Sequence, residues 1–387
     1  MLMKTTNLKA RLSSAIILTF FTGISLNSPA QEHHDDHADH QDNHSEEAGF
    51  DAGEMIMHHI SDAHEIHIIG DLAIYLPVIL YTEGGLEVFS SSHFYHNEEH
   101  GYYTNAAGED EDYHFYTHDN YVMFHEHIYY RGDNEVITVD PETGAATNEA
   151  VFDLSITKSV AGVLLTCLLL VLIFSSVAKS YKKRKGQAPK GLQSFMEPLI
   201  LFIRDEVAIP SIGSVAKAEK FMPFLLSTFF FIWIANMLGL IPFIGGFNVT
   251  GTLSVTMVLA TLVFVITTFS GNKHYWSHIL WPAGVPLPIK FILVPIEVAS
   301  IFIKPLVLMV RLTANITAGH IIILAFVSLI LIFGEQSATA GYGVGVGSTL
   351  FMIFMFFIEL LVAFLQAYVF TLLAALYFGE AKQEGHH

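Results

Sequence analysis

The sequence has little of three things that soluble proteins usually contain: cysteine, charge, and a balance of acidic and basic residues. Its single cysteine, Cys167, lies in an apolar run, so no intrachain disulfide can form. Only 14% of the 387 residues are charged and 52% are hydrophobic, which is typical of a polytopic membrane protein with a soluble part. Residues 31–150 hold 27 acidic residues against one basic residue, Arg131, which excludes nucleic-acid binding by this hydrophilic part.

Residues 1–30 have the pattern of a secretory signal peptide. Three basic residues precede a short apolar run, residues 15–26, and small residues follow at 28–30. An uncleaved first transmembrane helix is the alternative interpretation. In both cases the acidic segment that follows is expected to be exported.

Two segments of different character follow the predicted signal. Residues 31–49 are a low-complexity tract of His, Asp and Glu without a large apolar residue, so we predict that they are disordered. Residues 50–150 contain short β-branched and aromatic runs separated by Gly, Asn and Asp. This pattern predicts a small, mainly β domain on the exported side.

The histidines of this region leave several roles open. Of 21 histidines, 16 lie between His33 and His127, and some are four residues apart, as in His33/His37. A low-complexity tract lacks the fixed geometry of a specific metal site, so neither a metal site nor a cofactor is predicted. A dedicated metal site, an acidic antenna that gathers protons, and a contact for assembly are the alternative roles considered for the region.

Residues 155–387 predict an all-α membrane domain with about five membrane-embedded helices. The first, residues 156–178, is followed by the basic cluster 179–185, which places this end in the cytoplasm and the N-terminal side outside. Residues 221–244 and 251–270 are also long enough to cross.

The last two apolar runs, residues 288–333 and 347–378, are longer than a crossing requires. About 46 residues of helix extend about 69 Å, against about 30 Å for the hydrocarbon core. These lengths predict long helices that are strongly tilted or kinked, with Pro295 and Pro305 as candidate bends.

Two segments between the spans are interpreted from their composition. Residues 192–212 combine apolar residues with charges and prolines, so we predict an amphipathic helix on the cytoplasmic surface. The glycine-rich residues 341–347 follow no strand and precede a membrane helix. We predict a flexible exported loop there, not a phosphate-binding loop.

The two long runs contain ionisable and polar residues at membrane depth. These are Glu297, Lys304, Arg311, His320 and Glu359, with Asn315 and Gln366 as uncharged companions. A charge at the bilayer centre costs between about 2.5 and about 17 kcal/mol. A chain that keeps several such residues is expected to use them.

The spacing of these residues sorts them into helix faces. Glu297, Lys304 and Arg311 are seven apart and share one face, which Asn315 joins one turn later. His320, nine residues past Arg311, falls on the opposite side of an ideal helix, about 13.5 Å further along. We therefore predict that Arg311 and His320 are separate stations.

The chemistry divides in the same way. Buried histidine and glutamate exchange protons near neutral pH, whereas arginine stays charged. Protons can therefore pass through His320 and Glu359 but not through Arg311. A fixed positive charge favours the ionised form of a carboxylate beside it. The chain offers no such carboxylate for Arg311, so a partner is expected to supply it.

Simpler interpretations stay open for the same residues. Glu297 and Lys304 can form a surface pair that reaches water near a helix end. His320 can be a hydrogen-bonded packing residue. Arg311 can be a purely structural charge, although no acidic residue lies within one helical turn of it.

Three stretches resemble subunit a of F-type ATP synthases. "PIEVASIFIKPLVLMVRLTANITAGH", residues 295–320, resembles that family's signature helix. "ANMLGLIPF", residues 235–243, and "ELLVAFLQAYVFTLLAALYF", residues 359–378, are similar to two further family segments. The resemblance covers about residues 155–387, and the long exported segment before them departs from it.

The resemblance implies a role for each polar position. Arg311 would be the stator arginine that faces the carboxylates of a rotating ring of c subunits. The proton path would be formed by His320, Glu359, Gln366, Asn315 and Asn236. Glu297 and Lys304 are possible supporting residues.

The resemblance also implies a setting. The chain would have no catalytic centre of its own and would assemble with the c ring, b-type peripheral stalk subunits and the F1 sector. It would lie in the inner membrane of a bacterium with its C-terminus in the cytoplasm.

The alternative function is a metal-ion transporter with a His-rich exported domain. It needs several carboxylate or imidazole ligands among the spans, yet only His320 and Glu359 are at hand, and Arg311 would repel the cation. A structural membrane anchor would have no use for the buried charges.

Overall fold

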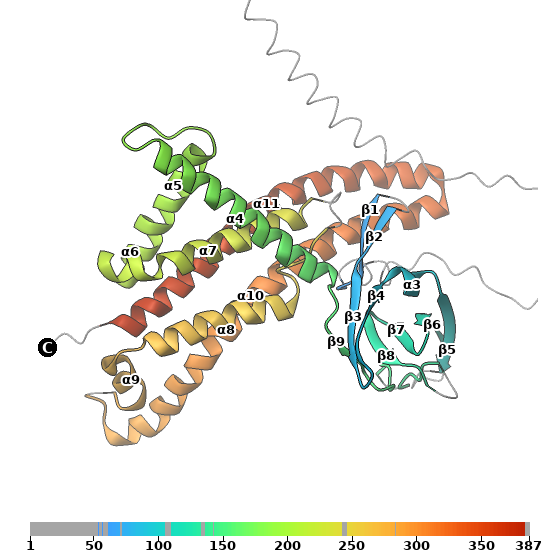
Figure 1. Ribbon diagram of the computed structural model, residues 1–387, viewed down its shortest axis with the longest axis horizontal. Helices are drawn as coiled ribbons and strands as arrows, with labels where there is room; N and C mark the ends of the chain where they lie inside the picture. Colours follow the sequence, from blue (N-terminus) through green and yellow to red (C-terminus); the bar gives the residue numbers. More distant parts are fainter. Residues whose placement is uncertain are drawn as a thin grey trace, which may run out of the picture. The chain divides into compact units, whose positions relative to one another are not determined.

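A computed structural model gives the fold (Figure 1). It describes Gly53, Ile56 and residues 61–69, 72–104, 110–132, 136–141, 143–241, 246–282 and 284–383. The predicted signal peptide, residues 1–30, and the predicted disordered tract, residues 31–49, lie outside the described residues.

The N-terminal region is mainly β-sheet, as predicted. Its sheets are antiparallel and have the strand orders β1-β2, β4-β3-β9 and β5-β6-β7-β8. The strands are β1 (Glu65–Ile69), β2 (Leu72–Tyr75), β3 (Pro77–Thr82), β4 (Gly85–Ser90), β5 (Glu98–Thr104), β6 (Asp110–His118), β7 (Tyr121–Phe124), β8 (His127–Tyr130) and β9 (Phe152–Asp153), with the short helix α3 (Ser92–Tyr95) between β4 and β5. Val78 and Leu80 are two residues apart on β3 and both point into a core with Phe94 and Met123. Successive side chains of a strand face opposite sides, so every second residue faces the same way.

Five helices in the described residues are long and apolar enough to cross a membrane, which confirms the predicted number. They are α4 (Lys158–Lys183), α7 (Val215–Gly239), α8 (Leu253–Ser270), α10 (Leu287–Gln336) and α11 (Ala338–Lys382). Shorter helical pieces connect them: α5 (Leu192–Phe202), the π-helical turn η1 (Ile203–Ala208), α6 (Ile209–Ile212) and α9 (Lys273–Leu280).

The segment predicted to be an amphipathic helix forms α5, η1 and α6 in succession. Met196, Ile203 and Val207 are buried on one face, whereas Asp205 and Glu206 are exposed. The apolar face packs into the helical core with α7 and α11, so burial of one side accounts for the helix despite its charges.

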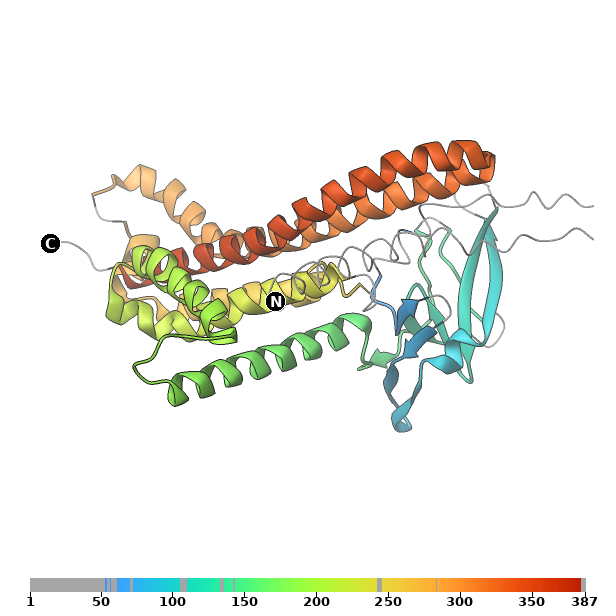
Figure 2. The same cartoon turned by 90° about the horizontal axis from the view of Figure 1, so that it is seen from above.

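Helices α10 and α11 lie side by side and form a long antiparallel hairpin (Figure 2). Figure 1 shows that α10 is bent in its first part. The two prolines inside α10, Pro295 and Pro305, lie in its first half. A proline removes one backbone hydrogen bond and crowds the preceding turn, so both are physical causes for such a bend.

The prediction of a glycine-rich loop at residues 341–347 is wrong, because α11 already begins at Ala338. One residue, Ser337, connects the two long helices, and its side chain accepts a hydrogen bond from the backbone N–H of Ala340 (3.2 Å). A Cβ on Gly341 would lie 2.8 Å from the backbone of Gly334 in α10. Glycine is therefore used here for close helix contact and not for flexibility.

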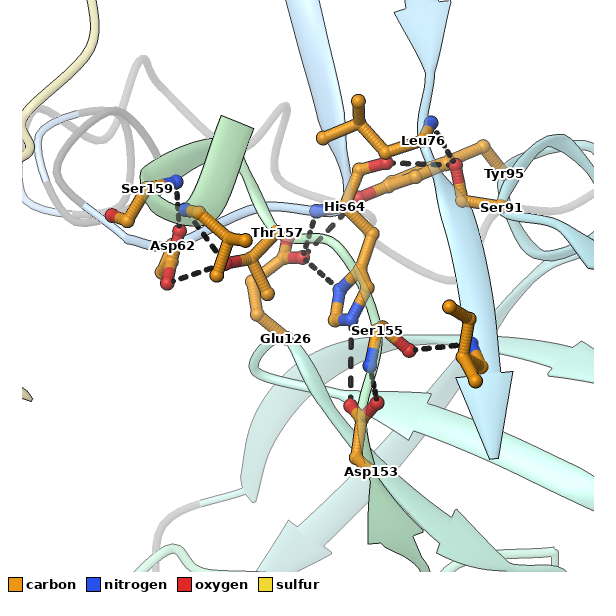
Figure 3. A network of polar contacts seen from close by, with 12 residues as sticks. Asp62, His64, Leu76, Ser91, Tyr95, Glu126, Asp153, Ser155, Thr157 and Ser159 are labelled. Atoms are coloured by element: carbon orange, nitrogen blue, oxygen red, sulfur yellow. Dashed lines mark hydrogen bonds and ion pairs between the residues drawn. The ribbon is translucent and has the colours of Figure 1, made fainter. Parts of the chain in front are cut away.

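A polar network joins the β-sheet region to the start of α4 (Figure 3). The Asp62 carboxylate accepts hydrogen bonds from the Thr157 hydroxyl (2.9 Å) and from the backbone N–H of Ser159 (2.7 Å). Since Thr157 is the N-cap residue of α4, the carboxylate satisfies donors at the helix N-terminus. The Ser159 hydroxyl in turn lies 2.6 Å from that of Thr252 before α8.

His64 is the buried centre of the same network (Figure 3). Its Nδ1 lies 3.4 Å from Glu126 Oε2, and its Nε2 lies 3.5 Å from Asp153 Oδ2, an ion-pair separation. Burial by itself would lower the pKa of His64, but Asp153 and Glu126 outweigh burial and raise this pKa to about 9. The imidazolium therefore holds two carboxylates of the β-sheet region together.

Candidate functional site

Arg311 lies on an exposed stripe of α10. The stripe consists of positions three or four residues apart, which share a helix face: Ile303, Val307, Arg311, Asn315, Ala318 and Ile322. The adjoining face carries Leu308 and Leu312, which are buried in the helical core. Among the described residues, no carboxylate forms an ion pair with Arg311, so the guanidinium stands in an otherwise largely apolar surface.

A side-chain hydrogen bond ties α10 to α11 one turn beyond Arg311. The amide of Asn315 donates to the side-chain carbonyl of Gln366 at 2.9 Å. Gln366 is only 4% exposed, whereas Asn315 lies on the exposed stripe. Through this hydrogen bond, the buried Gln366 holds the amide of Asn315 in place on the helix face that carries Arg311.

His320 of α10 and Glu359 of α11 lie at the same turn of α10, on different sides of that helix. A Cβ on Gly239 of α7 would lie 3.6 Å from Nε2 of His320. A Cβ on Gly319 would collide with the carboxylate of Glu359. The imidazole thus faces α7, the carboxylate lies over the backbone of α10, and three helices converge at these two side chains.

The carboxyl group of Glu359 has an unpaired oxygen. Its Oε2 is buried and forms no hydrogen bond with any described residue. A buried polar atom without a partner costs free energy, about 1–3 kcal/mol for a neutral group and more for a charged one. The fold keeps this cost at Glu359, so this carboxyl group retains an oxygen that can accept a hydrogen bond.

Asn236 braces the helices beside this carboxyl group. Its amide donates to the carbonyl of Ala363 (3.2 Å), one turn beyond Glu359 on α11, and its Oδ1 accepts from the Thr250 hydroxyl (2.5 Å). Asn236 is 4% exposed. Both ends of its amide are occupied, so it positions α7 against α11.

A third polar cluster lies at the other end of the hairpin. Lys304 forms an ion pair with Glu380 of α11, and its ammonium lies 5.3 Å from the ring centre of Tyr377. These side chains border a cavity of about 20 Å³ between α8, α9, α10 and α11. Glu297 is close enough that its carboxylate, after burial and Glu380, contributes to raising the pKa of Tyr275.

Glu380 was not predicted as a site residue, because the last helix was expected to end at Phe378. The signal was nevertheless present: Glu380 lies twenty-one residues, three times seven, past Glu359 and fourteen past Gln366. A seven-residue spacing keeps a helix face nearly constant. Lys304 therefore pairs with Glu380 across the hairpin and not with Glu297 along its own helix.

The fold and these clusters define a polytopic membrane subunit whose longest helices carry ionisable groups in an apolar setting. Residues 160–379 match the family model of the ATP synthase A chain. The chain belongs to this family, that of subunit a of the F0 sector. Residues 55–154 match a separate model, a domain of unknown function (DUF8433).

Curated relatives agree with the family model. The chain is 47% identical to ATP synthase subunit a 2 of Chlorobaculum tepidum over 251 residues, which cover 61% of this chain and 67% of that protein. It is 41% identical to ATP synthase subunit a of Chloroherpeton thalassium over 243 residues, 61% of this chain and 69% of that protein. For the subunit a of Pelodictyon phaeoclathratiforme the identity is 40% over 267 residues, 66% and 75% of the two chains.

The family is that of a non-catalytic, proton-translocating subunit, which assembles with other subunits of the ATP synthase. Its setting in a bacterial inner membrane fits the five apolar helices. The family assignment does not favour the alternative of a metal-ion transporter.

Proposed function

We propose that the chain provides the proton access half-channels of the F0 sector and the stator arginine that deprotonates the carboxylates of the c ring. In this way it couples proton flow across the membrane to ring rotation and ATP synthesis. The observation that carries the proposal is the exposed guanidinium of Arg311, which has no carboxylate partner among the described residues.

An unpaired cation in an apolar surface needs a counter-charge. Transfer of an isolated charge into an apolar environment is costly, and the cost falls when an opposite charge comes close. A carboxylate on a neighbouring subunit supplies that charge, and beside Arg311 it is favoured in its ionised form. Arginine does not release its proton. The partner carboxylate can therefore form an ion pair with Arg311, but no proton is transferred through Arg311 itself.

We assign the proton route to the cluster formed by His320 and Glu359. His320 and Glu359 are the titratable groups at the convergence of α7, α10 and α11, and both residue types exchange protons when they are suitably buried. Asn236 supports Glu359 through α11, and the Asn315–Gln366 hydrogen bond supports the arginine. Lys304 and Glu297 belong to the third cluster, near the C-terminal end of α11, as supporting residues.

The orientation follows from the distribution of charge. The basic residues 179–185 favour a cytoplasmic end for α4, so the region of residues 50–150 is exported and the C-terminus is cytoplasmic.

Helix α10 has 50 residues, and α11 has 45. Such helices span about 70 Å, so they lie strongly tilted in a core of about 30 Å. The c ring, b-type stalk subunits and the F1 sector are the proposed partners.

The test is replacement of Arg311 in the assembled enzyme. In Arg311→Ala, ATP-driven acidification of inverted vesicles should fall to background, because the ring carboxylate is no longer driven to release its proton. Arg204→Ala is the matched control: it removes an arginine from η1 that lies beside Asp205, and it should retain most of the pumping. Normal acidification in Arg311→Ala vesicles would refute the proposal.

A further inference from the structure

Two histidines and a glutamate meet on one face of the four-stranded sheet. His100 of β5 lies directly opposite His114 of β6 in the antiparallel register, and Glu98 lies two residues before His100. Residues two apart on a strand share a face. The ring centres of the histidines are 4.3 Å apart, and Nδ1 of His114 lies 3.1 Å from Oε1 of Glu98.

The three side chains place one ligand atom each within 4.8 Å of one another. A tetrahedral ion with bonds of about 2.1 Å holds its ligand atoms roughly 3.4 Å apart. The remaining difference is within reach of small side-chain rotations, because all three residues are exposed and their backbones are fixed by the sheet. The strand register therefore supplies the fixed geometry that a low-complexity His tract lacks.

We infer that Glu98, His100 and His114 bind a divalent transition-metal ion on the exported region, with Zn²⁺ as the reference ion. Two imidazoles and one carboxylate suit Zn²⁺, Cu²⁺ or Ni²⁺, whereas Ca²⁺ and Mg²⁺ prefer oxygen ligands only. Three protein ligands leave a fourth position for water.

The surroundings favour a cation. Residues 31–150 carry 27 acidic residues and one basic residue, so the field around the site attracts positive ions. Binding requires neutral imidazoles, so acidification should release the ion. This site is distinct from the membrane clusters, and it stands whether or not the proposed proton path is right.

The test is a zinc titration of the intact ATP synthase complex against a chromophoric chelator. The full chain contains other histidines, so the site is isolated as a difference between variants. The double variant His100→Ala/His114→Ala should bind one zinc equivalent fewer than the wild type. The control His96→Ala/His127→Ala removes two other exposed histidines of the same region and should keep that equivalent.

A milder variant guards against loss of the fold. Glu98→Gln keeps the size of an exposed side chain, and it should weaken zinc binding at this site at least tenfold. In the wild type, Cu²⁺ added at one equivalent should give an electron paramagnetic resonance signal with coupling to two nitrogens that His100→Ala/His114→Ala lacks. Equal zinc stoichiometry and affinity in the wild type, Glu98→Gln and the double histidine variant would overturn the inference.

Discussion

One glycine makes room for a proposed proton-path residue, and a second lies next to another. Gly319 lies beneath the carboxylate of Glu359, with which a Cβ would collide. A Cβ on Gly239 would lie too close to the backbone carbonyl of Phe247 (2.8 Å) but would make only an ordinary contact of 3.6 Å with the imidazole of His320. Neither has a positive φ, so backbone conformation does not require glycine at these positions. A glycine inside a helix costs up to about 1 kcal/mol relative to alanine. At Gly319 the missing side chain leaves space for the Glu359 carboxylate against the backbone of α10.

Substitution of Gly319 should move the Glu359 carboxylate. In Gly319→Ala the new methyl group occupies the place of that carboxylate, so passive proton conduction through F1-stripped membranes should fall several-fold. Gly345→Ala is the control, since its Cβ would make only an ordinary contact of 3.8 Å with Ile330. Unchanged conduction in Gly319→Ala, at equal amounts of assembled complex, would contradict this role of Glu359.

Some residue-level features were predictable from sequence and others were not. The four-residue spacing correctly placed Arg311 and Asn315 on neighbouring positions of one exposed helix face. The positions of Gly239 and Gly319 carry no such signal, because the atoms that approach them most closely, the Phe247 carbonyl and the Glu359 carboxylate, come from other elements. Helix periodicity describes one element at a time, whereas these contacts join three.

At the scale of elements, the α10–α11 hairpin carries its polar contacts in a regular order. From the Ser337 connection outwards they are Gly319 with Glu359, Asn315 with Gln366, and Lys304 with Glu380. The sequence predicted two long helices but not this pairing, because the turn between them was expected to be a loop and the last helix to end early. Both errors arose because glycines and charged residues were taken to mark the ends of helices. In the folded chain, tertiary contacts determine where these helices end.

The stability of the junction between the β-sheet region and α4 should depend on pH. The pKa of His64 is raised from 6.5 to about 9, so its contribution to folding is complete below pH 6.5 and is lost as the pH rises through 9. A shift of this size corresponds to about 3 kcal/mol. The pKa of Asp153 is lowered, because its bonds to His64 and Ser155 outweigh burial, so its contribution is lost only in acid. Other charged groups at the junction are Asp62, Glu65, Glu126 and Lys158.

Limited proteolysis of the exported region between pH 6 and pH 9.5 measures this dependence. Cleavage of the wild type should accelerate above about pH 8, while His64→Gln should be cleaved faster at pH 6.5 and change less with pH. His96→Gln, at an exposed histidine, should follow the wild type. Identical pH profiles for His64→Gln and the wild type would show that the imidazolium does not hold the junction.

At the scale of the whole molecule, composition and run length predicted the five apolar helices and the mainly β region. Apolar length is a property of each segment alone, so it can be read without a structure. The packing of Ile66 and Leu76 against Ala235, Phe247 and Val249 was not predictable. These residues come from segments far apart in the sequence, and only the folded chain brings them together.

The proposed orientation predicts which faces react with a membrane-impermeant thiol reagent. In a Cys167→Ser background, Gln187→Cys should be labelled in inverted vesicles, and Glu83→Cys should be labelled only after the vesicles are opened. Both positions are exposed, one after α4 and the other in the turn between β3 and β4. The reverse pattern would place the N-terminal region in the cytoplasm.

The antiparallel hairpin also limits how the length of this chain can change during evolution. One residue inserted between Lys304 and Gly319 turns every later side chain of α10 by about 100°, so at least one of the three contacts with α11 must break. An insertion near Ser337 lies beyond all three contacts and leaves them intact. Length variation among related chains is therefore expected at the Ser337 connection and excluded from the helix between Lys304 and Gly319.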